Sequence, residues 1–149
     1  MINCTWHFRF LKLAQEVASW SKDPSTQVGA VIVDDKRRPI SFGYNGFPRG
    51  IADTSELLQD REQKYKRVLH AEQNAILFSS KKDLSDCTIY TTHFPCSQCT
   101  ASLIQLNVGQ VISIQHPDFE GRWTENLRVS TSMLNEAGIH YQQFTLPTV

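Results

Sequence analysis

The sequence predicts an α/β fold of three layers, an α/β/α sandwich in which helices cover both faces of a mixed central sheet of about five strands. Two observations support this prediction. From residue 70 onward, short β-branched runs alternate with longer segments of helical periodicity, which is typical of layered α/β folds. Residues 28–33 form a continuous apolar run, which indicates a strand buried on both faces.

Apolar side chains from Trp6 to Trp20 recur at helical spacing and predict a helix over residues 5–21. This helix ends before Pro24, because proline cannot continue the helical hydrogen bonds. The other expected elements are strands at 28–33, 40–44, 88–91, 111–114 and 140–144, and helices at 70–79, 96–106 and 124–137. The pattern is weaker at 45–66, where we expect a surface loop with one short helix.

The composition limits the class of protein. A chain of 149 residues suits one domain, which we expect to span residues 1–149. Fifteen basic and fifteen acidic residues cancel, so no overall field attracts nucleic acid or an anionic membrane, and neither is an expected partner. No apolar run is long enough for a membrane helix and no signal peptide is recognisable. We therefore expect a cytoplasmic protein (host cytoplasm if the source is viral), whose four cysteines serve a purpose other than disulfide bonding.

Two short motifs stand at the starts of consecutive predicted helices. They are His70-Ala71-Glu72 and Pro95-Cys96-Ser97-Gln98-Cys99. Thiolates and a neutral imidazole are preferred zinc ligands, and a catalytic zinc site uses three of them and leaves one position open. His70, Cys96 and Cys99 supply such a set, and Glu72 would stand beside the open position to move protons.

Each motif alone also fits a different kind of site. A Cys-x-x-Cys pair also occurs in thioredoxin-like redox proteins or as two buried cysteines. A structural zinc site would need a fourth ligand, and His93 is near enough in sequence to be one. The joint occurrence of both motifs, in this order and at helix starts, favours a catalytic zinc site.

The combined pattern resembles the zinc-dependent cytidine deaminase superfamily and, within it, the deoxycytidylate (dCMP) deaminases. The resemblance extends from Ser21 to Phe144. Besides the zinc motifs, it rests on the stretches Ser21-Lys22-Asp23-Pro24-Ser25-Thr26-Gln27-Val28-Gly29-Ala30 and Gly43-Tyr44-Asn45-Gly46-Phe47-Pro48-Arg49-Gly50. These two stretches are what indicate dCMP as the substrate.

The resemblance implies a single zinc-dependent deaminase domain with a cytidine deaminase-like fold. It would hydrolyse dCMP to dUMP and ammonia, in pyrimidine nucleotide biosynthesis leading to dTTP. One Zn²⁺ per chain would be held by His70, Cys96 and Cys99, with Glu72 as the proton shuttle. The substrate-binding residues implied, or suggested by their position, are Asn45, the backbone of Ala71, Lys22, Ser25 and Thr26 for the phosphate, and Phe119 or Trp123 over the sugar. Asn45 could instead be a turn residue, because Asn-Gly is a common turn pair, and we assign no role to Gln73.

The same resemblance implies an allosteric homohexamer, activated by dCTP with Mg²⁺ and inhibited by dTTP. The effector-binding residues would be Gly46, Phe47, Arg49 and Gly50, since glycines allow a backbone to approach a triphosphate and Arg49 could pair with it. A plain surface loop is the alternative. Other functions that stay open are a tRNA adenosine deaminase, a free cytidine or guanine deaminase, and a nucleotide-binding regulatory protein.

Overall fold

The computed structural model describes residues 4–116 and 122–146, with Arg122 and Trp123 described by their backbone alone. Its elements in order are α1 (Cys4–Ala18), β1 (Gly29–Val33), β2 (Pro39–Tyr44), α2 (Ser55–Gln59), α3 (Arg61–Arg67), α4 (Ala71–Phe78), β3 (Thr88–Thr91), α5 (Ser97–Gln105), β4 (Gln110–Ile114), α6 (Arg122–Ala137) and β5 (His140–Phe144). None of the helices in the described parts of the chain has the length and apolar character that crossing a bilayer requires.

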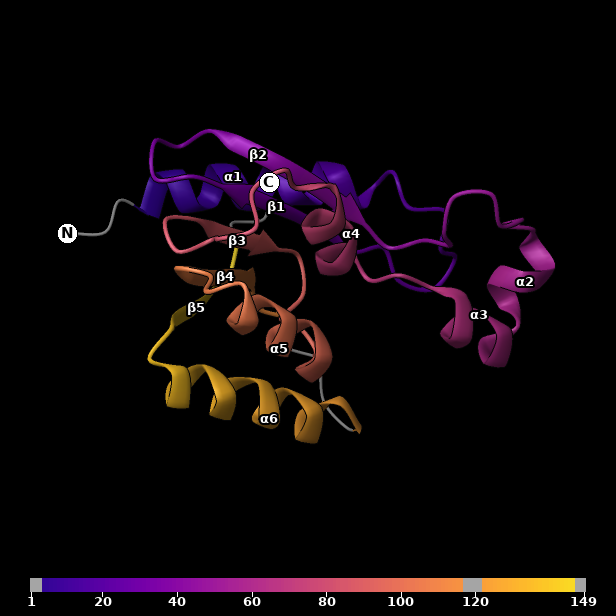
Figure 1. Cartoon of the computed structure of the whole chain (residues 1–149). Helices are drawn as coiled ribbons and strands as arrows, with labels where there is room; N and C mark the ends of the chain where they lie inside the picture. Colours follow the sequence, from indigo (N-terminus) through magenta and orange to yellow (C-terminus); the bar gives the residue numbers. More distant parts are fainter. Residues whose placement is uncertain (1–3, 117–121, 147–149) are drawn as a thin grey trace.

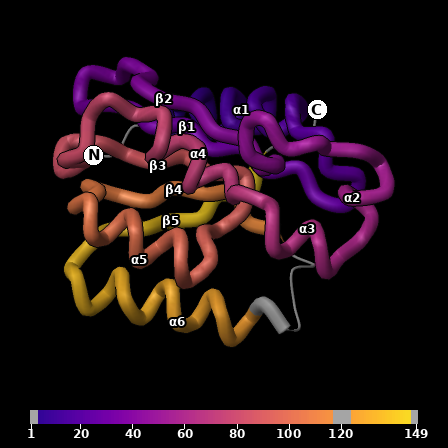
Figure 2. The backbone as a smooth tube through the Cα atoms, turned by 45° about the vertical axis from the view of Figure 1, so that its right-hand side comes forward, coloured from indigo at the N-terminus to yellow at the C-terminus, as the bar shows by residue number. Residues whose placement is uncertain are grey.

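The five strands form one mixed sheet in the order β2-β1-β3-β4-β5. β1 is antiparallel to both of its neighbours, and β3, β4 and β5 are parallel to one another. Helix α1 lies on one face of the sheet, whereas α4, α5 and α6 lie on the other (Figure 1). Figure 2 shows the same layers from a second direction, with α6 outside α5. The three-layer prediction is confirmed.

The alternation of side chains along the strands separates two apolar cores. On β1, Ala30 and Ile32 join α4, α5 and α6 in one core, whereas Val31 and Val33 pack against α1 in the other. Successive side chains of a strand point to opposite faces. The apolar run at 28–33 therefore serves both cores, as expected for a strand covered on both sides.

Two glycines allow helices to approach the sheet closely. A Cβ atom on Gly43 would lie 2.1 Å from the carbonyl oxygen of Ala71 and 2.4 Å from the amide of Ala75. A Cβ atom on Gly29 would similarly lie 2.1 Å from the carbonyl oxygen of Ala14. Gly43 thus sets the distance between β2 and α4, the helix that begins beside the predicted zinc ligand His70.

Residues 45–69, which we call the excursion, leave the sheet after β2 and return before α4. Its helices α2 and α3 lie to one side of the sheet (Figure 1). The expectation of one short helix here was wrong, because Thr54 caps the first helix through Leu57 N and Asp60 caps a second through Gln63 N. At the base of the excursion, Gly46 and Leu69 exchange two backbone hydrogen bonds.

Candidate active site

The predicted ligands stand at one edge of the sheet. β3 and β4 both end at this edge, where Thr91 lies opposite Ser113. His70 is the N-cap residue of α4, and Cys96 is the N-cap residue of α5. Backbone N–H groups at a helix start lack helical acceptors and favour nearby negative charge. The starts of α4 and α5 therefore lie together and favour the thiolate form of the predicted cysteine ligands.

The three predicted zinc ligands have the spacing that the ion requires. His70 Nδ1 lies 3.5 Å from Cys96 Sγ and 3.4 Å from Cys99 Sγ, and the three atoms lie within 4.8 Å of one another. Tetrahedral zinc bonds of ordinary length place a nitrogen and a sulfur ligand about 3.6 Å apart. These residues fit zinc, and no fourth His, Cys, Asp or Glu joins them in the described part of the chain. A zinc ion held by these three residues would keep a fourth position for water or substrate.

The electrostatics of this group suit a divalent cation. A hydrogen bond from the Cys99 thiol, helped by His70, lowers the pKa of Cys96 to about 4. The same contact with Cys96, together with burial, raises the pKa of Cys99. The hydrogen bond to Cys96 also raises the pKa of His70, against the effect of burial. The contact thus favours the thiolate form of Cys96, and a bound dication would favour loss of the Cys99 proton as well.

Glu72 lies beside these ligands in the first turn of α4 and is 4% exposed. Burial raises the pKa of Glu72 to about 7, although contact with the Cys99 thiol and the charge of His70 oppose the shift. A carboxyl group with a pKa near neutrality exchanges protons readily at physiological pH. The position and the chemistry of Glu72 are those expected of a general acid and base.

Gln73 has a structural role that the sequence analysis missed. Its Oε1 atom accepts a hydrogen bond from the backbone N–H of His70 at 2.7 Å. This is the side-chain contact of a capping box, in which a Gln or Glu three residues after the N-cap bonds back to it. Gln73 therefore fixes the peptide group of a predicted metal ligand, and the His70-x-x-Gln73 spacing was the signal for it.

His93 does not stand in the ligand group. Its ring stacks on His116, with centroids 4.3 Å apart and planes 14° apart, and its Nδ1 lies 3.2 Å from Thr92 Oγ1. Burial, with the nearby His116, lowers the pKa of His93 to about 4. The geometry therefore favours three ligands over a closed site that uses His93.

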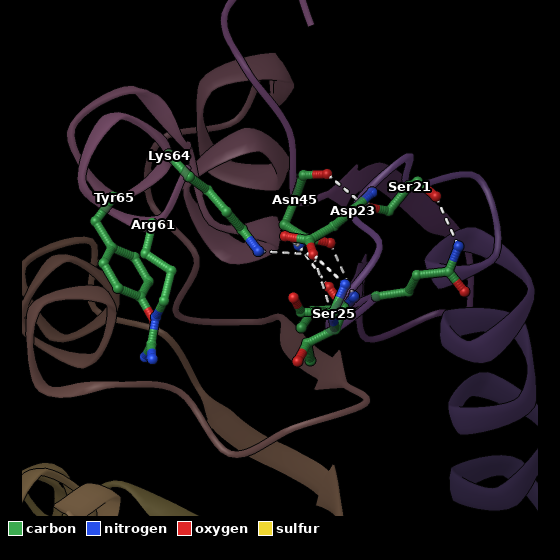
Figure 3. A network of polar contacts seen from close by, with 10 residues as sticks. Ser21, Asp23, Ser25, Asn45, Arg61, Lys64 and Tyr65 are labelled. Atoms are coloured by element: carbon green, nitrogen blue, oxygen red, sulfur yellow. Dashed lines mark hydrogen bonds and ion pairs between the residues drawn. The ribbon is translucent and has the colours of Figure 1, made fainter. Parts of the chain in front are cut away.

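The Asn45 side chain lies at the end of β2 and is engaged within the protein (Figure 3). Its Oδ1 atom accepts from Val28 N at 2.9 Å, and its Nδ2 atom donates to Thr26 O at 2.9 Å and to Asp23 Oδ2 at 3.3 Å. These bonds attach residues 23–28 to the end of β2. A contact of Asn45 with the nucleotide stays a prediction.

The predicted phosphate residues lie in the same segment. Ser25 and Thr26 are exposed, and their backbone N–H groups donate to Asp23 Oδ1. Lys22 is also exposed and forms an ion pair with Asp53 of the excursion, at 3.0 Å. The segment enters β1 at Gly29, whose N–H donates to Thr92 Oγ1. Residues 22–26 thus lead into a strand whose first residue, Gly29, contacts Thr92, the residue that follows β3.

The two aromatic residues proposed for the sugar are not placed. Phe119 lies outside the described residues. Trp123 lies in the first turn of α6, where the structure describes its backbone and not its side chain. Their roles stay predictions.

The four predicted effector residues lie at the start of the excursion. Gly50 has a φ of +84°, a conformation that favours glycine. The Arg49 guanidinium lies 5.6 Å from the centre of the Phe78 ring, and Arg49 is exposed. Gly46 contributes to the base of the excursion, and Phe47 next to it is partly buried. An exposed arginine beside a glycine turn is compatible with anion binding.

A hollow of about 230 Å³ lies at the opposite edge of the sheet, between α1 and the starts of β3 and β4. It is bordered by Trp6, Tyr90 and Gln110, among others, and contains none of the predicted site residues. The arrangement of chemical groups, and not the size of this hollow, therefore locates the candidate site.

Three ligands, an open position and a buried carboxyl define the class of a zinc-dependent hydrolytic site. Comparison with known proteins assigns the family. Residues 4–115 match the model of the cytidine and deoxycytidylate deaminase zinc-binding region. The chain belongs to this family.

Individual relatives agree with the family match. A deaminase of Aliivibrio fischeri (luxG 3′ region) is 49% identical over 135 residues, which cover 90% of each chain. The deoxycytidylate deaminase of Mus musculus is 35% identical over 147 residues, which cover 94% of this chain and 80% of the mouse protein. The crystal structure of the dCMP deaminase of cyanophage S-TIM5, in complex with dCMP and dUMP, is 25% identical. It has a TM-score of 0.78 and covers 97% of this chain and 100% of that one.

Proposed function

We propose that this protein is a hydrolase that converts dCMP and water into dUMP and ammonia. The observation that carries the proposal is the joint geometry of His70, Cys96 and Cys99 with the buried Glu72 beside them. Relatives along nearly the whole chain are deoxycytidylate deaminases, and the cyanophage neighbour is a dCMP deaminase with dCMP and dUMP bound. We further propose that residues 1–149 form a single deaminase domain, because both cores share one sheet.

Each residue of the site has a role in this reaction. His70, Cys96 and Cys99 would hold a zinc ion, which when bound would make a nucleophile available from water near neutral pH. Glu72 takes a proton from the attacking water and gives one to N3 of the cytosine ring. The oxygen of the water bonds to C4, and Glu72 then takes the remaining proton of this new hydroxyl group and delivers it to the exocyclic amine, so that the C4–N bond breaks, ammonia leaves and the uracil carbonyl forms. Burial of the carboxyl group favours this exchange, because its pKa lies near 7.

Substrate recognition would use the segment that surrounds this centre. Ala71 is the first residue of α4, and its N–H is one that the helix leaves free for the base. Lys22, Ser25 and Thr26 are exposed in the segment before β1 and offer donors to a phosphate. Asn45 would face the nucleotide, and its amide is held in place by residues 23–28.

Regulation and assembly are part of the proposal. A dCTP–Mg²⁺ complex would activate and dTTP would inhibit, through Arg49 and the glycine-containing turn around it. The assembly would be a homohexamer. Large exposed apolar side chains beside the edge strand β2 support self-association, since such patches mark interaction surfaces. They are Trp20, Phe42, Tyr44, Leu77 and Phe78.

The test is ammonia release by the zinc-loaded protein. dCMP, dCTP, deoxycytidine and CMP are supplied in parallel, each with and without dCTP–Mg²⁺ or dTTP. Turnover confined to dCMP, raised by dCTP and suppressed by dTTP, supports the reaction and its regulation. Turnover of dCMP that neither dCTP nor dTTP changes supports the reaction and contradicts the proposed regulation. If none of the four compounds is turned over, the proposed substrate is contradicted, and the result indicates a nucleic-acid or non-cytosine substrate instead. Light scattering gives the oligomeric state of the same sample.

A further inference from the structure

A buried ion pair connects the excursion to the predicted phosphate segment. Lys64 Nζ lies 2.8 Å from Asp23 Oδ1, and the two side chains are only 11% and 6% exposed. Figure 3 shows Lys64 reaching from α3 to the Asp23 carboxylate, whereas Arg61 and Tyr65 of the same helix lie apart. The second ion pair between these regions, Lys22–Asp53, is largely exposed and for that reason contributes little.

The Asp23 carboxylate is shared by several groups of the substrate segment. Besides Lys64, it accepts the backbone N–H groups of Ser25 and Thr26 at 2.8 and 3.1 Å and the Asn45 amide at 3.3 Å. Burial alone would raise the pKa of Asp23, but the bonds from Lys64 and the two amides outweigh it and keep the pKa low. A buried carboxylate of this kind needs a cationic partner, and Lys64 supplies it.

The Lys64–Asp23 ion pair is separate from the backbone contact next to the predicted metal ligand His70. Gly46 and Leu69 close the base of the excursion through their own backbone bonds, and Leu69 directly precedes His70. Lys64 lies further out along the excursion and contacts Asp23, in the segment with the residues predicted to bind the phosphate. Removing its charge should therefore disturb the segment that receives the sugar and phosphate before it disturbs zinc or Glu72.

We propose that Lys64 is a positioning residue for substrate binding, which through Asp23 holds residues 23–28 and the Asn45 amide in the conformation that receives the nucleotide. The excursion thereby becomes part of the recognition of dCMP, and a ligand that shifts α3 changes KM. This inference rests on the proposed function. What it adds is a role for Lys64 and Asp23, neither of which is among the predicted site residues.

The test compares Lys64→Met with Lys66→Met. Met keeps the length and apolar stem of lysine without the charge, and Lys66 is a matched control on the same helix whose ion pair with Glu62 is exposed. For Lys64→Met we expect KM for dCMP and the Kd for dUMP to rise about tenfold, the effect of losing one charged hydrogen bond. The kcat should stay within about twofold and zinc at one per chain. Lys66→Met should behave as the unmodified protein.

A second variant separates positioning from stability. Lys64→Met leaves a buried carboxylate unpaired, which can prevent folding, whereas Lys64→Met with Asp23→Asn removes both charges and retains an acceptor for the Ser25 and Thr26 amides. A raised KM in the folded double variant supports the proposal. Unchanged KM in either folded variant, or a loss of kcat that follows zinc loss, overturns it. An unmodified protein that does not turn over dCMP instead contradicts the proposed function itself.

Discussion

The side chain of Gln73 folds back along the first turn of α4 and accepts a hydrogen bond from the backbone N–H of His70 at 2.7 Å. This bond orients the peptide of His70, a predicted metal ligand, so we expect its loss to affect both the helix start and zinc binding. We expect Gln73→Leu to lower the free energy of unfolding by about 1 kcal/mol, the usual effect of losing a cap. It should also weaken zinc binding in a chelator competition. Gln73→Glu retains the acceptor and should preserve both properties, and equal zinc affinity in the Leu variant would exclude a role in the metal site.

Glu72→Gln should retain zinc and lose turnover. The amide fills the same space but cannot take up and release the proton, so we expect kcat for dCMP to fall at least about a hundredfold. The measurement is ammonia release at matched zinc content. Near-normal turnover with one zinc per chain would show that another group moves the proton.

The sequence predicted the fold because its strands and helices follow local patterns. The strands at 88–91 and 140–144 have the predicted bounds, since β-branched or alternating runs and flanking turn residues mark their ends. The grouping of His70, Cys96 and Cys99 was predictable for a similar reason, because their spacing and the two helix starts bring them together. Their geometry fits zinc in the structure.

The remaining parts of the site depend on contacts between distant segments. Lys64 lies in a strongly charged stretch that has the appearance of an exposed helix, and only the packing of α3 against residue 23 shows that it is buried. Asp23 carried a weak signal, since an Asp before Pro-Ser often bonds to the following backbone. No local pattern shows the long-range partner of such a side chain.

Cys99→Ser changes a predicted zinc ligand. Cys87→Ser is the matched control, because it makes the same chemical change at a cysteine that is not one of the three predicted ligands. Cys87 is buried and contacts Asp86. We expect Cys99→Ser to bind less than one zinc per chain and Cys87→Ser to keep one, because a serine hydroxyl is a poor zinc ligand. A chelator should lower the Tm of the unmodified protein, and added zinc should restore it, since a ligand that binds only the folded state stabilises it. Elemental analysis and thermal unfolding measure both effects, and zinc retained in Cys99→Ser would contradict the ligand assignment.

Gly43→Ala should separate β2 from α4. The added methyl group would meet the backbone of Ala71 and Ala75 at 2.1 and 2.4 Å, where no flexible side chain can move aside. We expect a loss of about 3 kcal/mol in the free energy of unfolding, typical of severe overpacking. Gly46→Ala is the control, because no atom lies within 4 Å of its added methyl group. Urea unfolding compares the two, and equal stability would mean that α4 shifts without cost.

Stability should fall in acid through His93. Burial, together with the stacked His116, lowers the pKa of His93 from 6.5 to about 4. Below pH 6.5 the unfolded chain therefore takes up a proton that the folded His93 does not. The contribution of the neutral His93 to the free energy of unfolding is complete above pH 6.5 and is lost progressively toward pH 4, so acid favours unfolding. Between about pH 7.5 and about pH 5 we expect a loss of about 2 kcal/mol from this residue. The His93→Gln variant lacks this loss. Burial also lowers the pKa of His7, but His7 contributes equally in the unmodified protein and in the variant. Urea unfolding of both zinc-loaded proteins across this range should give a shallower slope for the variant, and parallel slopes would show that His93 keeps its ordinary pKa in the folded state.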